Sequence, residues 1–433
     1  MSNDTIAIGG FVLLFVLMLL RVPVGIAMGL VGIVGFGFVT SDVDAALALL
    51  AQSPIRTVAD LQFAVIPLFL LMGAFASASG MSRELFRVSN AFVGHLKGGL
   101  GIATIAACGG FAAICGSSVA TAATFSSVAY PEMRRYGYPQ SFATGVIAAG
   151  GSLGIMIPPS TVLAVYGLIT EQDIGKLFIA GILPGILAVA MYIATISIIG
   201  FVRPSFLPSG TRQSWAERLA ALRDVWAVGL LFVFIIGGLY GGLFTATEAG
   251  GMGAAGAFII GVLRRKLSRK QFMRSLIESL RTTAAVFTIL IGALLFGYFL
   301  TVTQTPQALT TWLTGLGLSK YQVLSLILLM YLLLGCIMDA MAMIILTVPI
   351  IFPIIKQLGF DPIWFGVIVV VTVELGLIHP PVGMNVFVIK SVVRDVKLST
   401  IFYGVMPFVL TDILRLVILV VFPVIATFLP MHM

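Results

Sequence analysis

An apolar pattern that ends in consecutive prolines occurs twice in this sequence, with matching residues 222 positions apart. The matches are Pro131 with Pro353, Gly137 with Gly359, Gly154 with Gly376, Pro158 with Pro380 and Pro159 with Pro381. Each copy also has a small or polar break before its prolines, at 116–118 and at 338–340. Interrupted hydrophobic segments in corresponding halves of a chain are typical of the binding site of a secondary transporter. The duplication therefore predicts two related halves around one central site.

The composition indicates that most of this chain faces lipid or other apolar helices. Hydrophobic residues make up 59% of the 433 residues and charged residues only 10%, against about 25% charged in a soluble domain. Lipid leaves helices or closed barrels as the only spanning structures, because every backbone polar group must be paired. We therefore predict an all-α polytopic membrane protein in a lipid bilayer. The net charge of +8 does not indicate nucleic-acid binding, because in a membrane protein the location of the basic residues matters more than their sum.

Apolar runs mark the segments that are expected to cross a hydrocarbon core of roughly 30 Å. They are residues 6–20, 24–39, 61–79, 140–170, 176–202, 225–243, 246–263, 283–302, 361–393 and 401–428. Mixed or amphipathic segments are expected to lie along the membrane surface, at 43–60, 82–97, 267–282 and 304–319. The polar stretch 203–224 is interpreted as a cytoplasmic linker between a first repeat, 1–202, and a second repeat, 225–433.

Two regions are expected to form helical hairpins. Residues 98–133 and 321–357 each contain two apolar arms around a small or polar tip. The flanking charges fit either two short spans or a hairpin that enters and leaves on one side; the arms, of about 13–18 residues, are marginal for spanning and favour re-entrant hairpins. Each hairpin is followed by an apolar segment that contains a Pro-Pro pair, which predicts broken helices at 140–170 and 361–393.

The basic residues predict the orientation of the chain. Most lysines and arginines fall on one side of this map, which is cytoplasmic by the positive-inside bias. Only Arg56, Lys176, Lys320 and Lys356 fall on the other side, with the acidic loops at 41–44 and 171–173. Both termini are then expected to be outside. Five expected spans separate the two hairpins, so the hairpins would open to opposite sides and the halves would be inverted-topology repeats.

The first hairpin tip and the first break are rich in neutral oxygen atoms. Ser117 and Ser118 lie at the tip, and Ser160 and Thr161 follow the prolines. Consecutive prolines remove two backbone donors and disfavour helix before them, which frees carbonyl groups. Carbonyls and hydroxyls at membrane depth predict a site for a hard cation such as Na⁺. The alternative is a proline kink satisfied by neighbouring Ser and Thr; the second copy at the same offset favours the ion site.

The second copy carries a carboxylate where the first has a hydroxyl. Asp339 corresponds to Ser117, and burying an ionisable group at a helix centre costs about 2.5–3.5 kcal/mol, so Asp339 is predicted to have a transport role. Glu374 fits either a transport role or a structural ion pair. Asn385, after the second Pro-Pro pair, is a candidate ligand.

Other ionisable residues have simpler explanations. Glu248 is compatible with a first-turn carboxylate favoured by the helix dipole, and Asp412 with Arg415 is compatible with a local pair. His379, beside Pro380, is expected to be a hydrogen-bonded structural residue.

Four motifs carry a resemblance to a known family over essentially the whole chain. They are Gly-Ser-Ser-Val-Ala-Thr at 116–121, Gly-Ile-Met-Ile-Pro-Pro-Ser at 154–160, Met-Asp-Ala-Met-Ala-Met-Ile-Ile-Leu-Thr-Val-Pro-Ile at 338–350 and Leu-Gly-Leu-Ile-His-Pro-Pro-Val-Gly-Met-Asn at 375–385. Together they resemble the large membrane subunit (DctM- or SiaM-like) of tripartite ATP-independent periplasmic (TRAP) transporters.

The resemblance implies a multi-pass protein of the bacterial inner membrane that is not an enzyme, so the termini expected to be outside would be periplasmic. It implies Na⁺ symport of an organic carboxylate, such as a C4-dicarboxylate or sialic acid, through an elevator movement of the hairpin domain. A periplasmic binding protein would deliver the substrate, and a small four-helix membrane subunit would be a separate partner chain.

The resemblance also implies roles for individual residues. The first Na⁺ site would include Ser117, Ser118, Gly154, Ile157 and Pro159. The second Na⁺ site would include Met338, Gly376 and Pro381, with Asp339 in the adjoining substrate cavity. Substrate contacts are expected from Ser117, Ser118, Ser160, Thr161, Asp339 and Asn385. One departure is Cys115, where family members often carry serine.

Two other functions are compatible with parts of the sequence. The first is a self-sufficient Na⁺–anion symporter that has similar hairpins and needs no binding protein. The second, a remote alternative, is an intramembrane hydrolase that would use Ser117 or Ser118 with His379; no local nucleophile–base motif supports it, and it gives no reason for the doubled prolines.

Overall fold

The computed structural model describes residues 3–336 and 338–433, and within them the chain is helical apart from short connections and one isolated bridge between Lys97 and Ser209. The elements of the first half are α1 (Asn3–Leu19), α2 (Val24–Thr40), α3 (Val43–Ala59), the 3₁₀ turn η1 (Leu61–Ala64), α4 (Val65–Ala78), α5 (Met81–Val93), α6 (Gly99–Cys115), α7 (Ser118–Arg135), α8 (Gln140–Ser152), η2 (Leu153–Ile155), α9 (Thr161–Thr170) and α10 (Ile174–Val202).

The second half continues with a similar series of elements. They are α11 (Trp215–Asp224), α12 (Trp226–Tyr240), α13 (Ala246–Leu263), α14 (Arg269–Val302), α15 (Thr305–Gly315), α16 (Lys320–Gly335), α17 (Ala340–Gln357), α18 (Pro362–Ile378), α19 (Met384–Val392), α20 (Leu398–Val421), α21 (Val424–Thr427) and η3 (Pro430–His432).

The predicted all-α membrane architecture is confirmed. In the described part of the chain, six helical segments are long and apolar enough to cross a membrane, and the bent pair α11–α12 would make a seventh. α1 and α2, at 17 residues each, are apolar but slightly shorter. The multi-pass character therefore follows from the structure as well as from the composition.

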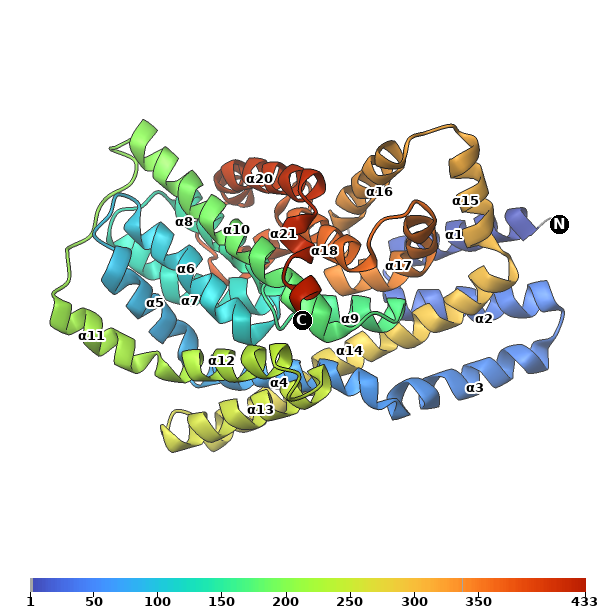
Figure 1. Cartoon of the computed structure of the whole chain (residues 1–433), viewed down its shortest axis with the longest axis horizontal. Coiled ribbons are helices and arrows are strands. Elements are labelled where there is room, and N and C mark those ends of the chain that lie inside the picture. Colours follow the sequence, from blue (N-terminus) through green and yellow to red (C-terminus); the bar gives the residue numbers. More distant parts are fainter. Residues whose placement is uncertain (1–2, 337) are drawn as a thin grey trace.

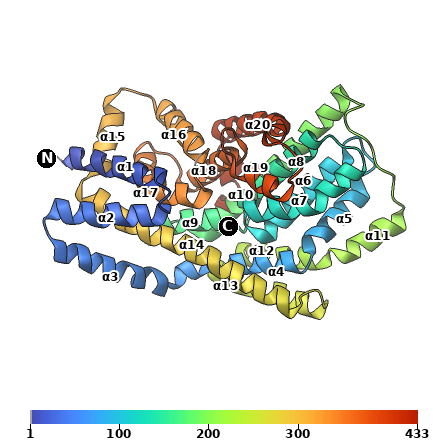
Figure 2. The same cartoon turned by 180° about the vertical axis from the view of Figure 1, so that it is seen from behind.

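The helices form two groups that lie on opposite sides of an elongated molecule (Figures 1 and 2). The long-edge helices, α2, α3, α4, α12, α13 and α14, run along one side. α14 packs along α2 and α4, and α4 also packs along α13. The hairpin group, α6–α10 and α16–α20, occupies the other side. The candidate Na⁺ and substrate residues all belong to the hairpin group or to the breaks within it.

Small residues allow the long-edge helices to approach closely. A Cβ atom on Gly32 of α2 would lie 2.5 Å from the backbone of Leu295 in α14. Small residues at such crossings are typical of helix packing in membranes. The hydrophobic effect does not drive helices together in lipid, so close van der Waals contact contributes more to their association. The α2–α14 pair is therefore expected to behave as one rigid unit.

The hairpins and the broken helices have the predicted order in both halves. The first hairpin is α6–α7, the first broken helix is α8–α9, and α10 follows. The second hairpin is α16–α17, the second broken helix is α18–α19, and α20 follows. Both breaks contain a cis Pro-Pro peptide bond, at Pro158–Pro159 and Pro380–Pro381. The division into inverted repeats, 1–202 and 225–433, stays our interpretation of this matched order.

One predicted boundary is wrong. Residues 267–282 were expected to form a surface connector separate from the span at 283–302, but α14 is one continuous helix of 34 residues. Ser268 caps its start in a capping box with Gln271, and the segment contains no proline that would end it. The change from polar to apolar composition reflects a change of surroundings along one helix, and it does not break the backbone.

The expected linker at 203–224 is partly structured. Its second half is α11, which begins with a capping box between Ser214 and Glu217. The backbone N–H and the hydroxyl of Ser214 both donate to Glu217, which lowers the pKa of this exposed carboxyl. Arg218 donates to the carbonyl of Ala91 at 3.1 Å. α11 is therefore held against α5.

Candidate functional site

The first hairpin turns sharply between α6 and α7. Gly116 ends α6 in a left-handed conformation, with φ of 62°, which favours glycine because other residues meet steric strain there. Ser117 is the N-cap of α7, and its hydroxyl accepts a hydrogen bond from the Ala120 backbone N–H at 3.3 Å. This turn leaves the Gly116 carbonyl outside the regular helix bonds of α6, whereas the Ser117 carbonyl accepts from the backbone N–H of Thr121 at 3.1 Å and from its hydroxyl at 2.8 Å.

The first Pro-Pro break packs directly on this hairpin tip. A Cβ on Gly154 would lie 2.5 Å from the Ser117 carbonyl oxygen, and a Cβ on Gly116 would lie 2.7 Å from the Pro159 carbonyl oxygen. The Thr161 hydroxyl donates to the Gly116 carbonyl at 2.9 Å. The structure thus brings together Ser117, Gly154, Pro159 and Thr161, which the sequence places in two separate motifs.

Three other predicted residues of the first site have different surroundings. Ser118 is buried beside Ser117 at the start of α7. The Ser160 hydroxyl donates to the Ile155 carbonyl at 2.5 Å and accepts from the Leu163 N–H at 3.1 Å. It therefore pairs backbone groups that the helix break leaves without helix hydrogen bonds. The Ile157 side chain packs near Gly185 of α10 and Gly109 of α6, which leaves its carbonyl as the only group able to bind an ion.

The second hairpin repeats this capping with a charged group. Asp339 is the N-cap of α17, and its carboxylate accepts from the Ala342 N–H at 3.3 Å, while the side chain is exposed. Met338 is buried beside it. α16 and α18 approach closely next to the tip, because a Cβ on Gly376 would lie 2.8 Å from the Cα of Gly335. Gly376 is therefore positioned against the second hairpin, as Gly154 is against the first.

The second break differs from the first in its polar groups. Gly383, in the left-handed conformation, caps α19 without a side-chain hydrogen bond, whereas Ser160 caps α9. Pro381 is exposed. Asn385 is fully buried and donates to the Ala148 carbonyl of α8 at 3.5 Å; its Oδ1 has no hydrogen-bond partner among the described residues. Asn385 therefore connects the second break to the first broken helix.

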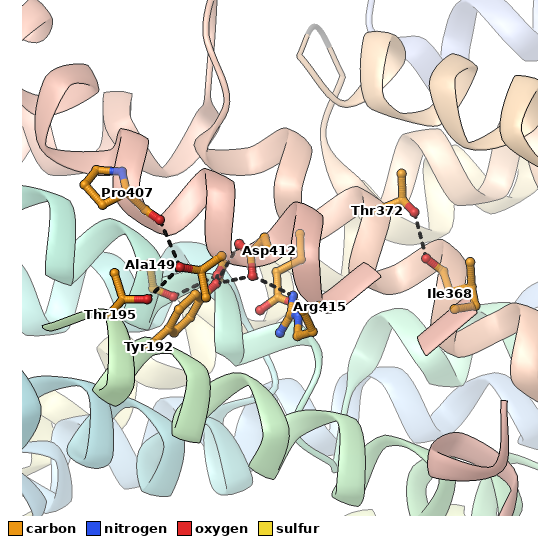
Figure 3. A network of polar contacts seen from close by, with 11 residues as sticks. Ala149, Tyr192, Thr195, Ile368, Thr372, Pro407, Asp412 and Arg415 are labelled. Atoms are coloured by element: carbon orange, nitrogen blue, oxygen red, sulfur yellow. Dashed lines mark hydrogen bonds and ion pairs between the residues drawn. The ribbon is translucent and has the colours of Figure 1, made fainter. Parts of the chain in front are cut away.

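A buried ion cluster joins three helices of the hairpin group (Figure 3). Arg415 of α20 pairs with Glu374 of α18 at 2.6 Å and with Asp412 at 3.1 Å. The Tyr192 hydroxyl of α10 lies 2.8 and 2.7 Å from the two Asp412 oxygens. All four side chains are fully buried. Glu374 thus forms the structural ion pair that the sequence allowed, and the predicted local pair of Asp412 and Arg415 is confirmed.

Two more ionisable residues have local partners. Glu248 accepts from the backbone N–H and hydroxyl of Thr245 in a capping box at the start of α13, which confirms the first-turn interpretation. The Nδ1 atom of His379 lies 2.5 Å from the Pro380 carbonyl oxygen and 3.7 Å from the Cys336 sulfur. His379 is therefore a hydrogen-bonded residue of the second break, as predicted.

The sequence did not lead us to expect one group of residues beside the first hairpin tip. A cavity of about 440 Å³ beside Ser117 is also lined by Arg274, Ser275, Glu278 and Ser279 of α14. These residues were missed because 267–282 was interpreted as a surface connector. Polar residues that recur on one helix face at spacings of three and four would have been the available signal.

Comparisons with known proteins agree with this architecture. Residues 11–425 match the family described as "Tripartite ATP-independent periplasmic transporter, DctM component". The C4-dicarboxylate TRAP transporter large permease protein DctM of Pseudomonas aeruginosa is 42% identical over 367 residues, which cover 84% of this chain and 83% of that protein. The protein of the same name from Rhodobacter capsulatus is 34% identical over 444 residues, covering 97% of this chain and 98% of that protein.

A solved structure has a related fold. The YdaH transporter of Alcanivorax borkumensis superposes with a TM-score of 0.63 over 90% of this chain and 89% of that chain, at 15% sequence identity. This likeness supports the fold alone. Given the match to the family along nearly its whole length, the chain belongs to the DctM component family of tripartite ATP-independent periplasmic transporters.

Proposed function

We propose that this chain is the large permease subunit of a Na⁺-coupled symporter that imports an organic carboxylate. A C4-dicarboxylate, sialic acid or a similar acid would be delivered by a periplasmic binding protein, and a small four-helix membrane subunit would complete the transporter in the bacterial inner membrane. The family's periplasmic, tripartite description supports both partners. Two relatives named for C4-dicarboxylate support a carboxylate substrate.

The observation that carries the proposal is the contact between the first hairpin tip and the first Pro-Pro break. The Gly116, Ser117 and Pro159 carbonyls and the Thr161 hydroxyl lie in one small region. These candidate ligands are neutral oxygen atoms, which suit a hard cation such as Na⁺. The carbonyls of Gly154 and Ile157 would complete the first Na⁺ site, and Met338, Gly376 and Pro381 would form the second.

The two helix groups support an elevator movement. In this proposal the hairpin group carries both ion sites and the substrate, while the long-edge helices stay fixed. The close packing of α2 against α14 favours a rigid scaffold, along which the hairpin group would slide. Asp339, exposed at the second tip, would face the substrate.

Membership in a transporter family excludes the intramembrane hydrolase, because the subunits of this family are permeases and not enzymes. A self-sufficient symporter is the alternative that the following experiment separates.

The test is uptake into proteoliposomes that contain this chain and its small subunit. We expect labelled substrate to accumulate only with the binding protein outside and an inward Na⁺ gradient. Uptake by this chain alone would contradict the tripartite arrangement. Uptake that is unchanged when K⁺ replaces Na⁺ and a proton gradient is the only driving force would contradict Na⁺ coupling.

A further inference from the structure

The cavity beside the first hairpin joins the two helix groups. It is lined by Cys115, Ser117 and Thr124 of the first hairpin and by residues of α14 and α4. α14 belongs to the long-edge helices, which pack against one another. Any ligand in this cavity would therefore contact both groups at once. Its volume of about 440 Å³ falls within the usual range of small-molecule sites, which is about 300–1,000 Å³.

Arg274 gives this cavity a positive charge. The side chain lines the cavity and is exposed, and no carboxylate in the described part of the chain lies within 4.0 Å of it. Glu278 follows one turn later, but an arginine that precedes a glutamate by four residues is in the less favourable order for a helix pair. The guanidinium is thus available for a carboxylate of a ligand, to which it can donate two parallel hydrogen bonds.

Hydroxyl groups with spare bonding capacity line the same cavity as Arg274. Ser279 is only 7% exposed, and its hydroxyl has no hydrogen-bond partner among the described residues. The Ser275 hydroxyl makes one long bond, to the Ala74 carbonyl at 3.4 Å. The Ser117 hydroxyl accepts one bond, at 3.3 Å, and its hydrogen is not engaged by that bond. A buried hydroxyl without a partner costs free energy, so a polar ligand would stabilise this wall.

Glu278 restricts which anions fit. It lines the same cavity as Arg274. When ionised, its carboxylate can accept hydrogen bonds but cannot donate them. A carboxylate with a plain hydrocarbon chain would place no donor near Glu278 and would feel its repulsion. A carboxylate that also carries a hydroxyl or amino group would pair its anionic end with Arg274 and donate to Glu278.

We propose that this cavity is a substrate subsite for carboxylates that carry a hydroxyl or amino group, with Arg274 binding the carboxylate and Glu278 accepting from the substituent. Ser117 and Ser279 bond the remaining oxygens. The inference rests on the proposed transport function, and it assigns a substrate class to it. Because Arg274 is on α14 and Ser117 is on the hairpin, movement of the hairpin group separates the two and dismantles the subsite.

The experiment uses three C4 acids that differ only at one carbon: succinate, malate and aspartate. Binding to the purified full chain in lipid nanodiscs is measured calorimetrically, in Na⁺ and in choline buffers. We expect malate or aspartate to bind at least about tenfold more tightly than succinate, the effect of one charge-assisted hydrogen bond. Arg274→Gln should weaken binding of all bound acids by about tenfold or more, whereas Glu278→Gln should remove the preference and leave succinate affinity unreduced.

Arg281→Gln is the matched control, because Arg281 is exposed on the same helix and does not line this cavity. The proposal is contradicted if no acid binds the wild type, if all three bind equally, or if Arg274→Gln binds as tightly as Arg281→Gln. Binding that depends on Arg274 but is the same in Na⁺ and choline buffers would contradict only the Na⁺ coupling of the proposed function. Na⁺-driven uptake that is unchanged in the Arg274→Gln variant would contradict only the assignment of this subsite.

Discussion

Ser117 and Asp339 occupy equivalent positions in the two hairpins, since each is the N-cap of the second hairpin helix. Ser117 accepts from the Ala120 N–H and Asp339 accepts from the Ala342 N–H, both at 3.3 Å. The shared geometry means that both residues contribute an N-cap, worth about 1 kcal/mol of helix stability. What differs between the copies is the negative charge of Asp339, and that difference can be tested separately from capping.

Replacing Asp339 with serine keeps the cap and removes the charge. We expect Asp339→Ser to abolish uptake while the free energy of unfolding stays within about 1 kcal/mol of wild type; Asp339→Ala should abolish uptake and lose the cap as well, with membrane insertion intact. Uptake and thermal unfolding of the purified variants would be measured together. Wild-type uptake by Asp339→Ser would show that capping alone is required.

The contact between the first tip and the first break leaves no room at Gly154. An alanine Cβ would meet the Ser117 carbonyl oxygen at 2.5 Å, and backbone atoms cannot move aside as a flexible side chain can. We expect Gly154→Ala to lose Na⁺-dependent uptake and about 1–3 kcal/mol of stability, as overpacking does.

Gly229→Ala in α12 is the control for that substitution, because its Cβ would meet nothing within 4 Å. The same loss of uptake in both variants would argue against a special contact at Gly154.

The buried cluster around Arg415 should be needed for folding. Arg415→Met would leave Glu374 and Asp412 buried without their cation, which costs about 3–5 kcal/mol for a buried ion pair. Arg281→Met, at an exposed position, should have little effect. Thermal unfolding in detergent checks both. If the two variants unfold at the same temperature, the cluster is not a major source of stability.

The predicted orientation can be checked by labelling introduced cysteines. The native Cys108, Cys115 and Cys336 are buried, so their background labelling should be low. In spheroplasts, a membrane-impermeant maleimide should label Ser41→Cys, in an expected periplasmic loop, but not Arg265→Cys. Labelling of Arg265→Cys before lysis would reverse the orientation and with it the periplasmic termini.

The sequence predicted the parts of the fold that have local causes. Consecutive prolines end helices through backbone chemistry, so the breaks at Pro158 and Pro380 could be predicted from the sequence alone. The cap at Ser117 and the tight position of Gly154 lie in separate motifs, and it was the resemblance to a transporter family that implied a shared site for them.

Other features depend on tertiary contacts and could not be read from the sequence. The Glu374–Arg415 pair joins residues 41 positions apart. No local sequence pattern around either residue predicts that the two side chains meet. The contact of Asn385 with α8 likewise follows from how the two halves pack. The role of α14 as a cavity wall was missed because a change of composition was interpreted as a helix boundary.

In our proposal the hairpin tips and the Pro-Pro breaks bind Na⁺. The most direct measurement is equilibrium binding of radiolabelled Na⁺ to the purified wild-type chain and to Gly154→Ala, with Gly229→Ala as control. We predict saturable binding that K⁺ does not displace, and weaker binding only in Gly154→Ala. Binding that is absent in the wild type, or equal in all three proteins, would contradict Na⁺ binding at the tips and breaks.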